Sequence, residues 1–382
     1  MAGAMVDHVM DPAGDVVLTL EWPTAGSSAS SNTDNSATHS TCSPDDSEES
    51  ESPGSPDPKA PDPVEAKHNV EAAHNVEQQP EASEPPIRLF STFRLSSRHL
   101  MLASTVFEAD LISGWQAGNG SNNSDLHISV RGFHPQALEI VLDAIHGQYR
   151  RIPKAIGLET LLGVATIVHH YGVHEPLQLL APIWIDHLSE ELPQNMESKK
   201  LVLQWILILW VFNDADRFTQ VTQVAMRYAV GELKNKALIP IPPQMLDAMN
   251  QRRKEMIEKI FVNFHALKDD FIHNTKGCSI ACSTLQLGVL VRTMFMLMLL
   301  GNTSEQCFGF FSAADIIQTI ESIEWPDFCE KGEERYARFR EVHVCPHNET
   351  TFRSECEALV EEIERRMTGL DLGDFVSSAL AL

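Results

Sequence analysis

The sequence predicts an α+β domain followed by an all-α domain. Short stretches rich in β-branched residues occur only in the first third of the chain, and after Pro193 the apolar residues recur at helical spacing alone. The chain has 382 residues, enough for about two domains of ordinary size. Its hydrophobic content of 43% is typical of a chain that buries a core.

The first predicted strand covers Asp15–Leu20 and ends before Pro23. The composition then changes, because residues 24–86 consist largely of Ser, Pro, Asp and Glu, with 13 acidic residues against two lysines. Such a segment cannot bury enough apolar surface to offset the entropy of ordering. We expect residues 24–86 to form a disordered acidic insertion.

A second strand is predicted where apolar residues resume, at Ile87–Phe93. Without a partner, the first strand would leave an exposed sheet edge. A long insertion adds little to the free energy of loop closure, because that cost grows only with the logarithm of loop length. We therefore expect the two strands to lie side by side in one sheet.

The second strand leads directly into a helix, within the segment Phe93–Phe107. Ser96 or Ser97 can serve as its N-cap, which accepts hydrogen bonds from otherwise unpaired backbone N–H groups. One face of this helix is expected to be buried, since apolar residues recur at Leu100, Ala103, Phe107 and Leu111. The segment has no acid, base or nucleophile placed for chemistry, which indicates a protein that works by contact.

Further elements complete the first domain, which we place at residues 10–190. They are a short strand at Leu126–Val130 and helices at 135–147, 158–172 and 175–187. The second domain is placed at residues 195–382. Its expected helices are Lys199–Asn213, Phe218–Glu232, Pro243–Lys268, Ser283–Leu300, Ala313–Glu321 and Phe352–Met367.

Charge and cysteine content narrow the class of protein. A net charge of −24 argues against binding nucleic acid or an anionic membrane surface, since both require clustered Lys and Arg. Two apolar stretches are better explained as core helices than as membrane spans, because 201–212 is too short and 285–300 contains Arg292. Seven cysteines and no secretory signal predict a reducing, cytoplasmic or nuclear location.

A metal site is one interpretation of several Cys and His residues. Soft ligands for zinc are available at Cys278, Cys282, Cys345 and His347. Buried structural thiols explain the cysteines better, because unpaired Cys is among the most buried residue types. We favour the buried thiols and predict no metal and no cofactor.

Two histidines and a set of aromatic and Met residues are further candidates for catalytic or binding groups. His169 and His170 lie in an apolar helical pattern, where packed or surface histidines are commoner than catalytic ones. The chain has no Gly-x-Ser-x-Gly, P-loop or Gly-x-Gly-x-x-Gly motif, so we predict no enzyme activity. Aromatic and Met side chains at helical spacing form either core or a partner groove, and core is favoured: Trp205, Trp210, Phe212, Met294, Phe295, Met296 and Met298.

The order of predicted elements then meets recognisable residues. The run His99-Leu100-Met101-Leu102-Ala103-Ser104-Thr105-Val106-Phe107 resembles the strand-to-helix segment of BTB/POZ domains. Asp15–Leu20 is similar to the opening strand of that family, and Ala165–Tyr171 to one of its helices. The resemblance covers about residues 10–190, excluding the insertion. Leu201–Phe212, Pro240–Pro243 and Gly369–Leu372 look like the helical extension of fungal BTB proteins.

The resemblance implies a BTB/POZ fold, in which helices cover a short sheet, followed by the helical domain. It implies a non-enzymatic module for protein–protein interaction. One function of such a module is that of a substrate adaptor for a cullin-type ubiquitin ligase. The alternative is a self-associating scaffold or nuclear regulatory protein with no ligase role. The expected partners are other proteins, either a cullin or a second copy, with no nucleic acid and no membrane, and the oligomeric state stays open.

Overall fold

The computed structural model describes residues 5–23, 88–116, 125–277, 280–324 and 352–375. The predicted acidic insertion at residues 24–86 lies outside these ranges. Within them the protein is a mixed α/β structure, with a four-stranded sheet near the N-terminus and twelve α-helices. The coarse prediction of a sheet-containing part followed by helices is confirmed.

The sheet joins segments from both sides of residues 24–87. Its strands are β1 (Met5–Val9), β2 (Val16–Pro23), β3 (Arg88–Leu95) and β4 (Leu126–Arg131), in the spatial order β1-β3-β2-β4. The two outer pairs, β1 with β3 and β2 with β4, run parallel. The prediction that the first strand lies beside the strand after the insertion is confirmed, because β2 and β3 are neighbours.

The sheet starts earlier than expected. Sequence reasoning placed the first element at Asp15 and the domain start at residue 10, whereas β1 pairs with β3 so that Met5 lies opposite Phe90. Because β1 is an edge strand, only one of its sides needs a backbone partner, and it does not require a clear alternation of apolar residues. The Met10 N–H continues the pairing by donating to the carbonyl of Arg94 at 3.0 Å.

The helix predicted after β3 is two helices, α1 (Ser97–Ala103) and α2 (Thr105–Gln116). Ser104 divides them: its hydroxyl donates to the carbonyl of Tyr171 at 2.5 Å and accepts from the N–H of Phe107 at 3.1 Å. A single unbroken helix was expected because the apolar spacing continues through this point. The tertiary bond to Tyr171 explains the break.

Three helices follow β4 as expected. They are α3 (Pro135–Ile145), α4 (Leu158–Tyr171) and α5 (Ala181–His187). The expected helix at 175–187 is instead a 3-10 turn at Glu175–Leu177 followed by α5. Gly172 ends α4 in the left-handed conformation, with φ of 68°, which suits glycine because it has no Cβ.

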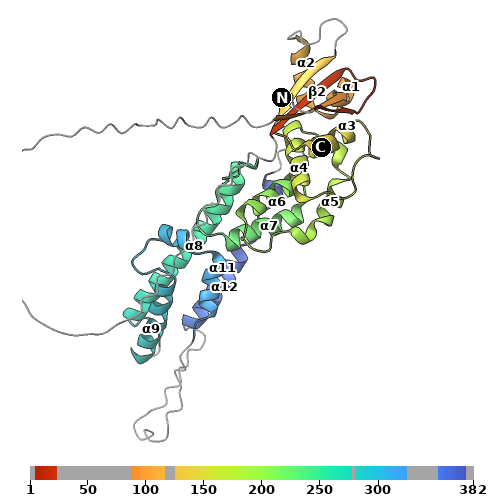
Figure 1. Ribbon diagram of the computed structural model, residues 1–382. Coiled ribbons are helices and arrows are strands. Elements are labelled where there is room, and N and C mark those ends of the chain that lie inside the picture. Colours follow the sequence, from red (N-terminus) through yellow and green to blue (C-terminus); the bar gives the residue numbers. More distant parts are fainter. Residues whose placement is uncertain (1–4, 24–87, 117–124, 278–279, 325–351, 376–382) are drawn as a thin grey trace, which may run out of the picture. The chain divides into compact units, whose positions relative to one another are not determined.

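The remaining regular elements in the described residues are helices, joined by turns and loops. The helices are α6 (Lys199–Val211), α7 (Ala215–Tyr228), α8 (Pro243–Ile272), α9 (Ile280–Met296), α10 (Ser304–Phe310), α11 (Ala313–Glu321) and α12 (Phe352–Arg366). All were predicted within a few residues except α10, which is short and begins with a capping box at Thr303 and Gln306. Figure 1 shows α8 beside α9, in agreement with their extensive contacts.

The sheet-bearing part and the helices after residue 195 share one compact unit. Helix α4 packs against α6, and the rings of His169 and Trp210 lie 4.8 Å apart. The indole N–H of Trp205 donates to the carbonyl of Glu191 at 3.1 Å. The predicted boundary near residues 190–195 is therefore crossed by buried contacts, and the division into two domains stays a prediction.

The segment after α12 returns to α7 and α6. The N–H of Leu370 donates to the hydroxyl of Thr222 at 2.9 Å, and the hydroxyl of Thr219 donates to the Leu370 carbonyl at 3.0 Å. The indole of Trp210 donates to the carbonyl of Phe375 at 3.2 Å.

Among the described residues, no helix combines the length and the apolar character that crossing a bilayer requires.

Candidate interaction surface

Helix α2 has an inner face that packs tightly. The ring of Phe107 stacks on the ring of Tyr171, with centroids 3.9 Å apart and planes 7° from parallel, and Leu111 is fully buried. A Cβ placed on Gly114 would lie 3.2 Å from a methyl of Leu126 in β4. Helix α2 therefore approaches the sheet closely, and the side chains of its inner face are packed against the protein.

The outer side of α1 and α2 is also apolar. Leu102 is 89% exposed, and Val106, Ile112 and Trp115 are each more than a third exposed. Ile112 and Trp115 are three residues apart and so lie as neighbours on the outside of α2, whereas Val106 lies six residues before Ile112, near the start of that helix. Clustered exposed apolar side chains mark interaction sites more often than isolated ones do. We call Leu102, Val106, Ile112 and Trp115 the α1–α2 surface.

Sequence reasoning missed this surface although a signal was present. The predicted buried face comprised Leu100, Ala103, Phe107 and Leu111, of which Ala103 is only half-buried and the other three are buried. The apolar residues at positions 106 and 112 fall on the other side of the same helix. Apolar side chains that lie outside the buried face of a helix remain exposed unless another element or a partner covers them.

The start of α1 is held by a carboxylate from another segment. The Asp15 carboxylate accepts from the backbone N–H of Ser97 at 2.8 Å and from its hydroxyl at 2.7 Å. Neither predicted serine cap acts as expected, since the Ser96 side chain makes no capping bond and Ser97 is the first helical residue. Partial burial opposes ionisation of Asp15, but the Ser97 hydrogen bonds outweigh it and lower the pKa of the carboxyl.

A histidine supports the same turn. The imidazole Nε2 of His146 accepts from the N–H of Ser96 at 3.0 Å, while its Nδ1 lies 2.8 Å from the carbonyl of Leu142. This arrangement requires the neutral ring with the proton on Nδ1. Burial lowers the pKa of His146. The Asp15 and His146 bonds together fix the start of α1, the helix that carries Leu102.

The histidines considered for catalysis lie at the surface. His169 and His170 at the end of α4 are both exposed. The ring of His170 meets the ring of Tyr171 edge-on at 4.6 Å. Although His169 is exposed as a whole residue, partial desolvation of its ring lowers its pKa. These contacts are aromatic packing.

The candidate metal ligands are not assembled in the described part of the chain. Cys282 is buried in α9, where its sulfur accepts from the side-chain amide of Gln286 at 3.0 Å. Cys278, Cys345 and His347 lie outside the described residues. Among those that are described, no group of three or more His, Cys, Asp or Glu is placed to hold a metal ion.

The aromatic and Met-rich run divides between core and surface. Trp205, Trp210 and Met294 are buried, as the favoured interpretation expects. Phe212 is half-buried. The other three side chains of the run are exposed: Phe295, Met296 and Met298.

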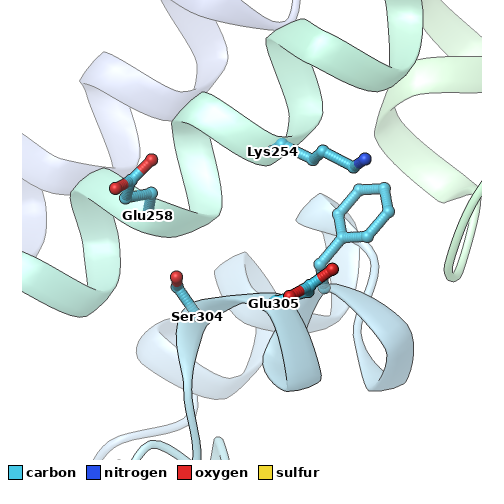
Figure 2. Close-up of a pocket in the computed structure, with 5 residues that line it drawn as sticks. Lys254, Glu258, Ser304 and Glu305 are labelled. Carbon is cyan, nitrogen blue, oxygen red and sulfur yellow. The ribbon is translucent and has the colours of Figure 1, made fainter.

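A pocket lies between α8 and α10. Figure 2 shows Lys254 and Glu258 of α8 facing Ser304 and Glu305 of α10. The Lys254 ammonium also lies 5.5 Å from the centre of the Phe308 ring, which completes the lining. Catalysis by a serine requires a hydrogen-bonded base. No histidine is among the described residues that line this pocket, so no imidazole base for Ser304 lies in it.

Comparison with known proteins identifies no protein similar to this chain. No family model, no curated protein and no solved structure matches the chain. The structure therefore defines a mixed α/β protein with a small sheet, a helical remainder and exposed apolar side chains on α1 and α2.

Proposed function

We propose that this protein is a non-enzymatic module for protein–protein interaction of the BTB/POZ type. The observation that carries the proposal is the α1–α2 surface. Two of its four exposed apolar side chains, Leu102 and Val106, lie on the run that resembles the family, and hydrogen bonds from Asp15 and His146 fix the start of α1. Burial of such side chains between partners is the main source of affinity at protein interfaces.

The proposed role is that of a substrate adaptor for a cullin-type ubiquitin ligase. The sheet-bearing part would contact the cullin, and the helical part would select the client protein. The alternative is a self-associating scaffold or nuclear regulator with no ligase role. The exposure of Leu102 favours this alternative to the same degree, because a side chain on a short helix can meet its own copy across a twofold axis.

Binding of the full-length chain to a purified cullin N-terminal region tests the adaptor role. The Leu102→Glu variant places a charge in the surface and is expected to weaken binding at least about tenfold, equivalent to about 1.4 kcal/mol. Leu179→Glu is the matched control, because Leu179 is 84% exposed and lies outside α1 and α2. Its affinity should match that of the wild type.

The same variants separate the two functions. Sedimentation velocity of each protein alone reports self-association. Loss of self-association in Leu102→Glu, with no cullin binding by the wild type, supports the scaffold. A wild-type chain that binds no cullin and stays monomeric contradicts both functions.

A further inference from the structure

Helix α3 buries a carboxylate with incomplete hydrogen bonding. Asp143 is 2% exposed, and its Oδ1 atom has no hydrogen-bond partner in the described structure. Its ion pair with the guanidinium of Arg151 spans 3.6 Å, a separation too long for a hydrogen bond. An ionised carboxylate is costly to bury unless it is both paired and hydrogen-bonded. The site therefore favours the protonated, neutral form of Asp143.

The end of β1 lies beside this carboxylate. The Arg151 Nη1 atom that faces Asp143 also donates to the carbonyl of Val9 at 3.3 Å and to the sulfur of Met10 at 3.5 Å. The side-chain amide of Gln148 donates to the Met10 carbonyl at 3.4 Å. The end of β1 and the turn after α3 therefore enclose Asp143 together, and opening of β1 would let water reach the carboxylate.

A second charge pair joins β1 to α3. The Nδ1 atom of His8 lies 3.2 Å from Oε1 of Glu139, and the His8 ring stacks on the ring of Phe93 in β3. Glu139 lies one helical turn before Asp143, so each carboxylate opposes the ionisation of the other. A proton on His8 would add a positive charge that attracts both. We call His8, Glu139, Asp143 and Arg151 the β1–α3 cluster.

Titratable residues on the other elements packed against α3 do not pair with Asp143. In the described part of the chain, none of them shares a hydrogen bond or an ion pair with it: Arg98 and His99 in α1, Glu159, His169, His170 and Tyr171 in α4, and Glu175 in the 3-10 turn. Burial is the largest influence on Asp143 and raises its pKa, whereas Arg151 lowers the pKa and Glu139 raises it. The surroundings of Asp143 thus favour proton uptake in the folded protein.

We propose that the β1–α3 cluster is a proton-dependent latch, in which proton uptake holds β1 against the sheet and proton loss favours its opening. Because β1 is an edge strand beside β3, its opening would uncover a row of backbone N–H and C=O groups on β3. Such a row can pair with a strand of another chain. The latch makes access to the edge of β3 depend on pH.

The direction of the pH dependence follows from the burial of Asp143. When β1 opens, the carboxyl regains water and its pKa returns toward the ordinary value. Protons therefore bind more tightly while β1 is closed, so the closed state gains stability as the pH falls toward the raised pKa. A proton on His8 acts in the same direction, because the closed state places it beside Glu139. None of these residues belongs to the α1–α2 surface, so different variants test the latch and the proposed function.

Amide hydrogen exchange of residues 5–10 in the full-length chain tests the latch. The measured rates, divided by the intrinsic exchange rates, give the opening constant of β1. Asp143→Asn keeps the shape of the side chain without its charge, and it should lower the opening constant at pH 7.5 by at least about threefold. Asp247→Asn, at an exposed residue of α8, is the control and should open like the wild type. Equal opening constants for Asp143→Asn and the wild type overturn the proposal.

The wild-type chain provides a second test that does not depend on the folding of Asp143→Asn. Its opening constant should rise by at least about threefold from pH 5.5 to pH 7.5. His8→Gln should reduce this rise, whereas His273→Gln, at an exposed histidine, should leave it unchanged. Local exchange is measured because burial lowers the pKa of His146 and gives the whole fold the opposite dependence on pH. A wild-type opening constant that is equal at both pH values, or that falls as the pH rises, overturns the proposal.

Discussion

Helices α3 and α9 differ in how their sequence relates to their orientation. In α3 the buried side chains are apolar with one exception, Asp143. In α9 buried Ser, Gln and Thr alternate with buried apolar residues, while large apolar side chains face outward. The orientation of α3 follows from hydropathy alone. The orientation of α9 follows from hydrogen bonds to the segment before it and to α12.

The largest expected difference is in the free energy of unfolding, when one leucine of α3 and one leucine of α9 are each replaced by alanine. Leu138 of α3 is fully buried, so Leu138→Ala should lower the free energy of unfolding by about 2–5 kcal/mol. Leu285 of α9 is 49% exposed, and Leu285→Ala should cost less than about 1 kcal/mol. Urea unfolding measures both. Equal losses would contradict the outward orientation of Leu285.

A smaller effect tests the bonds that orient α9. Ser283→Ala removes the hydroxyl that donates to the Lys276 carbonyl, and it should destabilise the protein by about 1–2 kcal/mol. The neighbouring Thr284→Ala is the control, because Thr284 is exposed and alanine is the better helix former. Its stability should be unchanged or slightly higher. A Ser283→Ala protein as stable as the wild type would show that this bond does not set the orientation.

The smallest effect is a dependence of stability on pH in the sheet-bearing part. The pKa of His146 is lowered by burial, so the unfolded chain takes up the proton before the folded chain does as the pH falls. The contribution of His146 to the free energy of unfolding is fully present above about pH 6.5, the pKa of its side chain in the unfolded chain. That contribution is lost as the pH falls toward the lower pKa of the folded protein. The melting temperature should therefore decrease from pH 7 to pH 5.5.

Variants assign this dependence to its source. His146→Gln should flatten the decrease, whereas His273→Gln, at an exposed histidine after α8, should leave it unchanged. Some slope should persist in His146→Gln, since the pKa values of His169 and His174 are also lowered by burial. An unchanged slope in His146→Gln would contradict the role of this ring.

The candidate sites were only partly predictable. Hydropathy identified Leu100, Phe107 and Leu111 as core, and all three are buried. It could not identify the outer residues of α2 or α9 as exposed. When apolar residues occur on both sides of a helix, their spacing does not indicate which side faces the protein. Of the four candidate metal ligands, against which buried thiols were favoured, only Cys282 lies in the described residues, and no cluster forms around it there.

The amino-acid sequence by itself determined the positions of most helices, through apolar spacing and caps, and the pairing of β2 with β3, since an unpaired strand edge is unfavourable. Tertiary structure alone decided three further features: the pairing of β1, the break at Ser104 and the orientation of α9. Each depends on a hydrogen bond between residues distant in the chain. The local sequence pattern indicates which residues prefer burial. It does not indicate which polar groups, distant in the chain, will form hydrogen bonds with one another.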